Sequence, residues 1–177
     1  MQHFFLPSLM AVLLFISGPA CAQENFIAVR YFVKKDSVMI RWAPSSPELF
    51  RTASEKGYKI VRTDLRNGDK KIISDEKILP LSKDNPQWAG LIKTNSNAAL
   101  LNELLFLPDN FGGNMSSQQK QTYLNTIFGF VLFSCDQDAE LAKTAGLIFT
   151  DVSFEKNVTY SYSVELSDNP DGFAYKK

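Results

Sequence analysis

Histidine and cysteine are nearly absent from this sequence of 177 residues, which holds one histidine, His3, and two cysteines, Cys21 and Cys135. His3 and Cys21 lie in an N-terminal stretch that we expect to be removed, so only Cys135 would remain. Without a histidine to act as the base, a Ser/His/Asp or Cys/His catalytic site is excluded in the shortened chain. A single cysteine also excludes an intrachain disulfide and a Cys/His zinc site.

The chain also lacks a net charge, because its 19 Lys and Arg residues balance its 19 Asp and Glu residues. Nucleic acids and anionic membranes attract basic surfaces. The composition therefore gives no electrostatic argument for either partner, and we expect no nucleic-acid binding.

The N-terminal stretch has the layout of a secretory signal peptide. Residues 4–16 are mostly apolar, residues 17–19 break the run, and residues 20–22 supply the small side chains of a cleavage site. The apolar run is too short to span a membrane. We therefore predict a signal peptide over 1–22 and one domain over 23–177, exported to the periplasm, the cell surface or the medium.

A lipid anchor at Cys21 is the alternative to soluble export. The residues before it, Gly18-Pro19-Ala20, lack the large aliphatic residue that a lipoprotein signal carries three places ahead of its cysteine. The sequence thus favours soluble export.

Alternating apolar and polar residues predict strands at both ends of the remaining chain. In Val158–Leu166 every second residue is apolar or aromatic, which is typical of a strand with one buried face. Four further strands are predicted over 26–33, 37–42, 58–63 and 147–154. The tight-turn signal Asn67-Gly68 predicts a short returning strand over 70–74. We expect the strand over 147–154 to join Val158–Leu166 through a turn at 155–157, as two paired strands of an antiparallel sandwich.

The middle of the chain, about 80–146, is expected to be helical instead. Leu100, Leu104 and Leu107 share one helical face, and Leu124, Ile127, Phe128 and Val131 share another. Four helices are predicted over 85–93, 97–107, 116–133 and 136–145. Because the strand pattern resumes afterwards, we interpret this stretch as an insertion into the sandwich. A shorter helix is expected between Ser46 and Gly57.

The strands carry residues that resemble a fibronectin type III domain. Trp42 ends the second strand, Tyr58 stands in the third, and Tyr160 and Tyr162 begin the sixth. The run Arg41-Trp42-Ala43-Pro44, followed by Gly57-Tyr58, is similar to domains of large secreted Bacteroidetes proteins that carry a helical insertion. The resemblance covers 26–74 and 145–166. It implies a mainly β fold, a fibronectin type III-like antiparallel sandwich interrupted by a helical segment, in which the Tyr160 hydroxyl closes a corner.

The sequence departs from this family at its end, because a seventh strand belongs after residue 166. Residues 173–175 (Phe-Ala-Tyr) could begin a short one. Either the last strand is short, or this sequence is the leading piece of a longer protein. An incomplete sheet leaves an edge open to pairing, here near Leu166.

Few residues suggest chemistry. Cys135 is expected to pack in the core, and Asp136 and Asp138 to lie at the start of a helix. Asp151 is expected to form hydrogen bonds in a turn. We therefore predict no carboxylate catalysis, and we also expect no metal and no cofactor.

Trp42 shares a face with Val38 and Ile40 and is expected in the core. Trp88 is the one candidate for a ligand contact, although core packing is favoured.

These observations favour a non-catalytic, exported binding or structural module that contacts a protein or a glycan at the cell envelope. Function inferred from fold is an analogy. The alternative hypothesis is an accessory domain of a larger secreted hydrolase.

Overall fold

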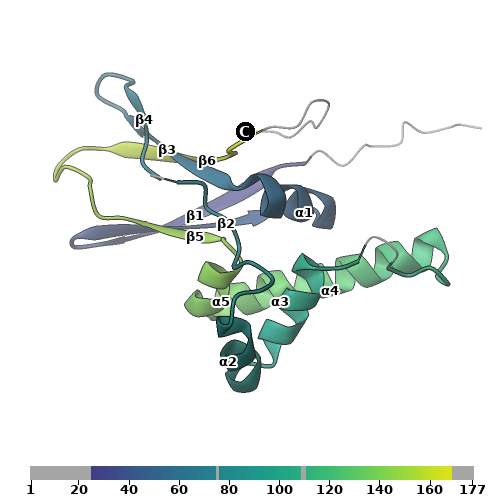
Figure 1. Ribbon diagram of the computed structural model, residues 1–177. Coiled ribbons are helices and arrows are strands. Elements are labelled where there is room, and N and C mark those ends of the chain that lie inside the picture. Colours follow the sequence, from purple (N-terminus) through teal and green to yellow (C-terminus); the bar gives the residue numbers. More distant parts are fainter. Residues whose placement is uncertain (1–24, 75, 109–110, 169–177) are drawn as a thin grey trace, which may run out of the picture.

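The computed structural model describes residues 25–74, 76–108 and 111–168 (Figure 1). The predicted signal peptide, Cys21 and the predicted start of a seventh strand at 173–175 lie outside the described residues. Within the described residues, no helix is long and apolar enough to cross a membrane.

The first sheet is antiparallel and contains β1 (Ile27–Lys34), β2 (Ser37–Pro44) and β5 (Ile148–Asp151), in the order β1-β2-β5. A tight turn at Lys35-Asp36 joins the first two strands, as the sequence predicts. Val38, Ile40 and Trp42 of β2 are buried on one face, which confirms the alternation expected there.

The second sheet is also antiparallel and contains β3 (Tyr58–Asp64), β4 (Lys70–Ile72) and β6 (Tyr160–Leu166), in the order β4-β3-β6. The expected pairing of the last two strands is therefore wrong: β5 pairs with β2, and β6 pairs with β3. The segment between β5 and β6 crosses from one sheet to the other. Alternation indicates which face of a strand is buried, but it does not indicate which strand lies beside it.

Helix α1 (Pro47–Lys56) begins and ends where the sequence predicts. The Ser46 side chain accepts a hydrogen bond from the Leu49 backbone N–H at 3.1 Å, which satisfies one of the unpaired groups of the first turn. Gly57 ends the helix at φ 78°, a conformation that favours glycine. The helix buries Leu49, Phe50 and Ala53.

Four further helices lie between β4 and β5, within the region predicted to be helical: α2 (Gln87–Thr94), α3 (Asn97–Leu105), α4 (Ser117–Gln137) and α5 (Ala139–Thr144). A capping box formed by Ser116 and Gln119 starts α4. The expectation for Asp136 is wrong, because α4 continues through it, whereas Asp138 does cap α5. The described helices hold more residues than the strands, so the fold is mixed rather than mainly β.

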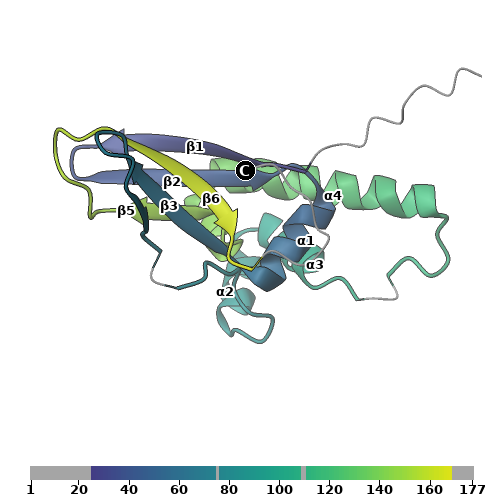
Figure 2. The same cartoon turned by 90° about the horizontal axis from the view of Figure 1, so that it is seen from above.

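The elements form layers that share one hydrophobic core. Figure 1 shows the two sheets one above the other, with α2 to α5 on the far side of the β1-β2-β5 sheet. Seen from above, α1 lies at one end of the strands and α4 extends beyond them (Figure 2). The rings of Phe50 in α1 and Phe128 in α4 lie 5.9 Å apart, so α1 packs on the helical layer too.

Candidate binding surface

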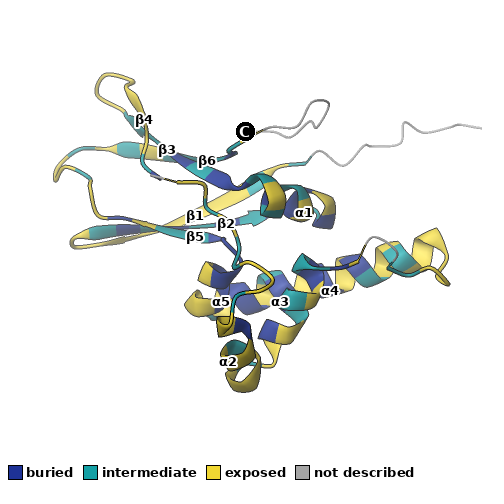
Figure 3. Ribbon diagram, in the orientation of Figure 1, coloured by how far each residue is buried: buried dark blue, intermediate teal, exposed yellow. Residues whose placement is uncertain are grey.

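Strand β1 exposes its side chains on the same face of the sheet on which the neighbouring strand β2 buries them. Its residues Val29, Tyr31 and Val33 lie directly opposite the buried Trp42, Ile40 and Val38 of β2, so both sets share one face. The β1 side chains are nevertheless 38%, 63% and 72% exposed. Figure 3 shows most of β1 in the colour of exposed residues. We call Val29, Tyr31 and Val33 the inner row.

The inner row is exposed because of where the second sheet lies. Trp42 of β2 packs edge-on against Tyr58 of β3, with ring centroids 5.3 Å apart. The Tyr162 hydroxyl of β6 reaches Asp151 of β5 at 3.0 Å. Thus β3 and β6 cover β2 and β5. Strand β6 also approaches β1, but within the described ranges no further strand lies beyond β6 to cover the rest of β1.

The other face of β1 is apolar as well. Phe26 and Phe32 are both partly exposed there, and Arg30 is the one charged residue between Ile27 and Val33. A strand with one wet face would carry polar residues at these positions. Contiguous apolar surface of this kind usually marks an interaction site.

The free edge of β1 presents unpaired backbone groups. Both backbone groups of Phe26 bond to Ser45, at the end of β2, at 2.9 Å. Along a strand, the backbone N–H and C=O groups of successive residues point to alternate sides. The N–H and C=O groups of Ala28, Arg30 and Phe32 therefore also point toward β2. Those of the inner row point away from it, and no strand among the described residues pairs with this edge.

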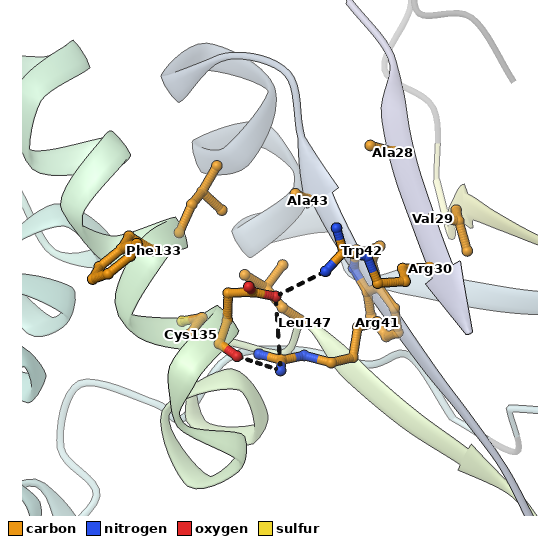
Figure 4. Close-up of a pocket in the computed structure, with 11 residues that line it drawn as sticks. Ala28, Val29, Arg30, Arg41, Trp42, Ala43, Phe133, Cys135 and Leu147 are labelled. Carbon is orange, nitrogen blue, oxygen red and sulfur yellow. Dashed lines mark hydrogen bonds and ion pairs between the residues drawn. The ribbon is translucent and has the colours of Figure 1, made fainter. Parts of the chain in front are cut away.

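A pocket of about 410 Å³ lies between the β1-β2 hairpin and the end of α4 (Figure 4). Arg41 donates to the Asp136 backbone carbonyl at 2.9 Å, and the Asp136 carboxylate lies 3.7 Å from Arg30. Through its carbonyl and its carboxylate, Asp136 thus attaches the end of α4 to the two strands of the hairpin. Phe133 stands exposed at the pocket.

Cys135 lines the same pocket but is buried. Burial raises the pKa of its thiol to about 12. The thiolate is the nucleophilic form of cysteine, so Cys135 is unreactive at neutral pH. The packing role expected from the sequence fits this position.

Asp151 forms the most extensive polar network in the described part of the chain. One carboxylate oxygen accepts from the backbone N–H and the hydroxyl of Ser153, each at 2.8 Å. The other accepts from Arg62 at 2.7 Å and from the Tyr162 hydroxyl at 3.0 Å. Burial would raise the pKa of Asp151, but the hydrogen bonds from Ser153, Arg62 and Tyr162 outweigh it and lower the pKa. A carboxylate held ionised in this way joins the two sheets and is unsuited to act as an acid.

The aromatic residues singled out in the sequence lie in two places. Trp42 and Tyr58 are buried between the sheets, and Tyr160 and Tyr162 surround the Asp151 network. The Tyr160 hydroxyl accepts from the Glu155 backbone N–H at 3.4 Å, and its ring lies 4.6 Å from the Arg62 guanidinium carbon.

Trp88 lies apart from them, in the helical layer. It is 5% exposed, its indole N–H donates to the Ser82 carbonyl at 2.9 Å, and its ring packs edge-on against Phe106. A ligand platform needs an open aromatic face, which Trp88 does not present. Its environment is that of a core residue.

The exposure of β1 does not follow from the alternation alone, although the sequence contains a signal for it. Large apolar residues occupy both faces of the strand, with Phe26 and Phe32 on one side and the inner row on the other. Such a strand must be either covered on both faces or exposed to a partner.

Among the described residues, no group of three or more His, Cys, Asp or Glu side chains could hold a metal ion. Comparison of the chain with protein-family models, with curated proteins and with solved structures found no match.

Proposed function

We propose that this chain is a non-catalytic, exported binding or structural module that associates with another protein through β1. The observation that carries the proposal is the exposed inner row, three large apolar side chains in register with the core of β2. Burial of apolar surface drives most protein association. The residues most suited to chemistry, Asp151 and Cys135, are engaged in structure.

We further propose that the fold is of the fibronectin type III kind. Immunoglobulin-like sandwiches place strands A, B and E in one sheet and C, F and G in the other. The group β1-β2-β5 corresponds to A, B and E, and β3 and β6 correspond to C and F, with β4 added beside β3; within the described residues no strand takes the place of G. The contact of the Tyr160 hydroxyl with the Glu155 backbone resembles a tyrosine corner, which supports the same reading.

A protein is favoured over a glycan as the partner. Both tryptophans are buried, and the exposed Tyr31 lies between two valines. An apolar stripe of this kind suits the alternating side chains of another polypeptide strand.

The alternative hypothesis, an accessory domain of a larger secreted hydrolase, stays a prediction. An in-frame continuation of the gene after Lys177 would favour it.

Site-specific photo-crosslinking in the cells that produce the protein tests the proposal. We would place a photoreactive amino acid at Val33 and, as a matched control, at Leu65, which is 57% exposed in the turn after β3 and so belongs to the other sheet. We expect a discrete adduct with a second polypeptide, either another envelope protein or a second copy of this chain, from position 33 and none from position 65. Equal adducts from both positions, or none from position 33, would overturn the proposal.

A further inference from the structure

We infer that two copies of this chain pair edge to edge through β1, antiparallel and centred on Tyr31. The inference uses the same surface as the proposed function and names a second copy of the chain as a partner. It rests on three observations: the direction of the free backbone groups, the order of side chains along β1, and the gradient of exposure along the inner row.

The backbone of β1 is arranged for such pairing. The outward-pointing N–H and C=O groups belong to Ile27, Val29, Tyr31 and Val33, as the bonds between Phe26 and Ser45 establish. A two-fold axis at Tyr31 places Tyr31 opposite its copy and Val29 opposite Val33 of the second copy. Residues opposite one another exchange both backbone hydrogen bonds, so three consecutive pairs are satisfied.

Repulsion between like charges favours the register centred on Tyr31 over the registers centred on Arg30 and Phe32. An axis at Arg30 would place two guanidinium groups directly opposite each other, and an axis at Phe32 would place Arg30 opposite Lys34. Both arrangements are destabilising. With the axis at Tyr31, Arg30 lies opposite Phe32 of the second copy, where a guanidinium can stack on the ring.

The length of β1 excludes the two registers further along the strand. An axis at Val33 would place Tyr31 opposite Lys35, which lies in the turn after β1. An axis at Val29 would place Val33 opposite Asn25, which lies before the start of β1. Val33 is the most exposed member of the inner row and Val29 the least. Centring on Tyr31 joins the two inner rows into one apolar stripe and covers the residues that most need covering.

The arrangement is also closed. A two-fold interface uses the same patch on both copies, so pairing stops at the dimer and does not propagate into a fibre. The two β1-β2-β5 sheets would form one continuous sheet across the axis.

Cysteine pairing across the axis tests the register. In a Cys135→Ala background, Tyr31→Cys should give a disulfide-linked dimer under mild oxidation, because hydrogen-bonded antiparallel pairs have Cα atoms about 5.5 Å apart, within disulfide range. Val29→Cys alone and Val33→Cys alone should form no disulfide-linked dimer, whereas a mixture of the two should link. Leu65→Cys serves as the exposed control. Linkage of Tyr31→Cys no faster than that of Leu65→Cys, or self-linkage of Val29→Cys, would overturn the inference.

Sedimentation of the unmodified chain tests the association itself. We expect a dimer whose fraction rises with concentration, and loss of that dimer in Tyr31→Pro, which removes an outward N–H that the folded monomer does not use. Ile72→Pro is the matched control, because Ile72 lies in the edge strand β4 between residues whose backbone groups face β3, so its N–H points outward as well; this variant should dimerise normally. A monomer at every concentration would overturn the inference. If position 33 still crosslinked another protein, the proposed function would survive that failure.

Discussion

The guanidinium of Arg62 in β3 donates to Oδ2 of Asp151 in β5 at 2.7 Å, and the pair connects the two sheets. The side chains are 10% and 1% exposed, so this is a buried ion pair. Exposed pairs of this protein, such as Lys156 with Asp36, lie on the surface and contribute little.

Removing Arg62 should therefore destabilise the fold strongly. Arg62→Met leaves the Asp151 carboxylate buried without its counter-charge, and we expect a loss of about 3–5 kcal/mol in the free energy of unfolding. Lys156→Met is the matched control and should change the free energy by less than about 0.5 kcal/mol. Urea denaturation measures both. Similar values for the two variants would contradict the bridging role of the pair.

Stability should also fall in acid because of Asp151. Its pKa is lowered in the folded chain, so its contribution is complete above the ordinary aspartate pKa of about 3.9 and is lost as the pH falls through the folded value. The urea midpoint of the unmodified chain should drop between about pH 4 and about pH 2 more steeply than that of Asp151→Asn. Asp36→Asn, at an exposed position, should keep the steep slope.

The two tyrosines of β6 should differ in what their hydroxyls contribute. Tyr162→Phe removes a hydrogen bond to a buried carboxylate and should cost about 1.5–3 kcal/mol. Tyr160→Phe removes only the longer contact with the Glu155 N–H and keeps the ring beside Arg62, so we expect a cost below about 1 kcal/mol. Thermal unfolding of the two variants gives the order, and the reverse order would favour a dominant tyrosine corner.

Two glycines should respond in opposite ways to alanine. Gly146 has φ 65°, and a Cβ there would lie 2.8 Å from the Leu79 carbonyl carbon, so Gly146→Ala should destabilise. Gly129 lies inside α4 with nothing near the Cβ position, so Gly129→Ala should stabilise by about 0.5–1 kcal/mol. Melting temperatures of the two variants would show shifts of opposite sign.

Cys135 should resist modification while the chain is folded. Because its thiol is buried and its pKa is raised to about 12, iodoacetamide at neutral pH should react only after unfolding in urea. Mass spectrometry of the alkylated chain follows the reaction. Rapid labelling of the folded chain would show that the end of α4 opens from the sheet.

Most elements could be predicted from the sequence because each has a local cause. The caps at Ser46, Ser116 and Gly57 depend on neighbouring backbone groups, and the alternation in β2 and β6 depends on one buried face. The partner of β5 could not be predicted, since strand neighbours are set by contacts between residues far apart, such as Arg62 and Asp151.

The candidate site was harder to predict than the fold. The inner row looks like an ordinary buried face in sequence, and only the position of β6 shows that it is open. Trp88 attracted attention as a large aromatic residue in an insertion, yet the carbonyl of Ser82 and the ring of Phe106 account for it.

The helical layer leaves and rejoins the sheets at a single place. Gly146 leaves no room for a Cβ against the backbone of Leu79 and Pro80, and the Leu81 N–H donates to the Thr144 carbonyl at 2.8 Å. The first and last residues of this layer therefore lie side by side and are hydrogen-bonded to each other. A change of length within a loop of this layer therefore leaves β4 and β5 in place, provided that the helices keep the apolar residues by which they share the core of the sheets.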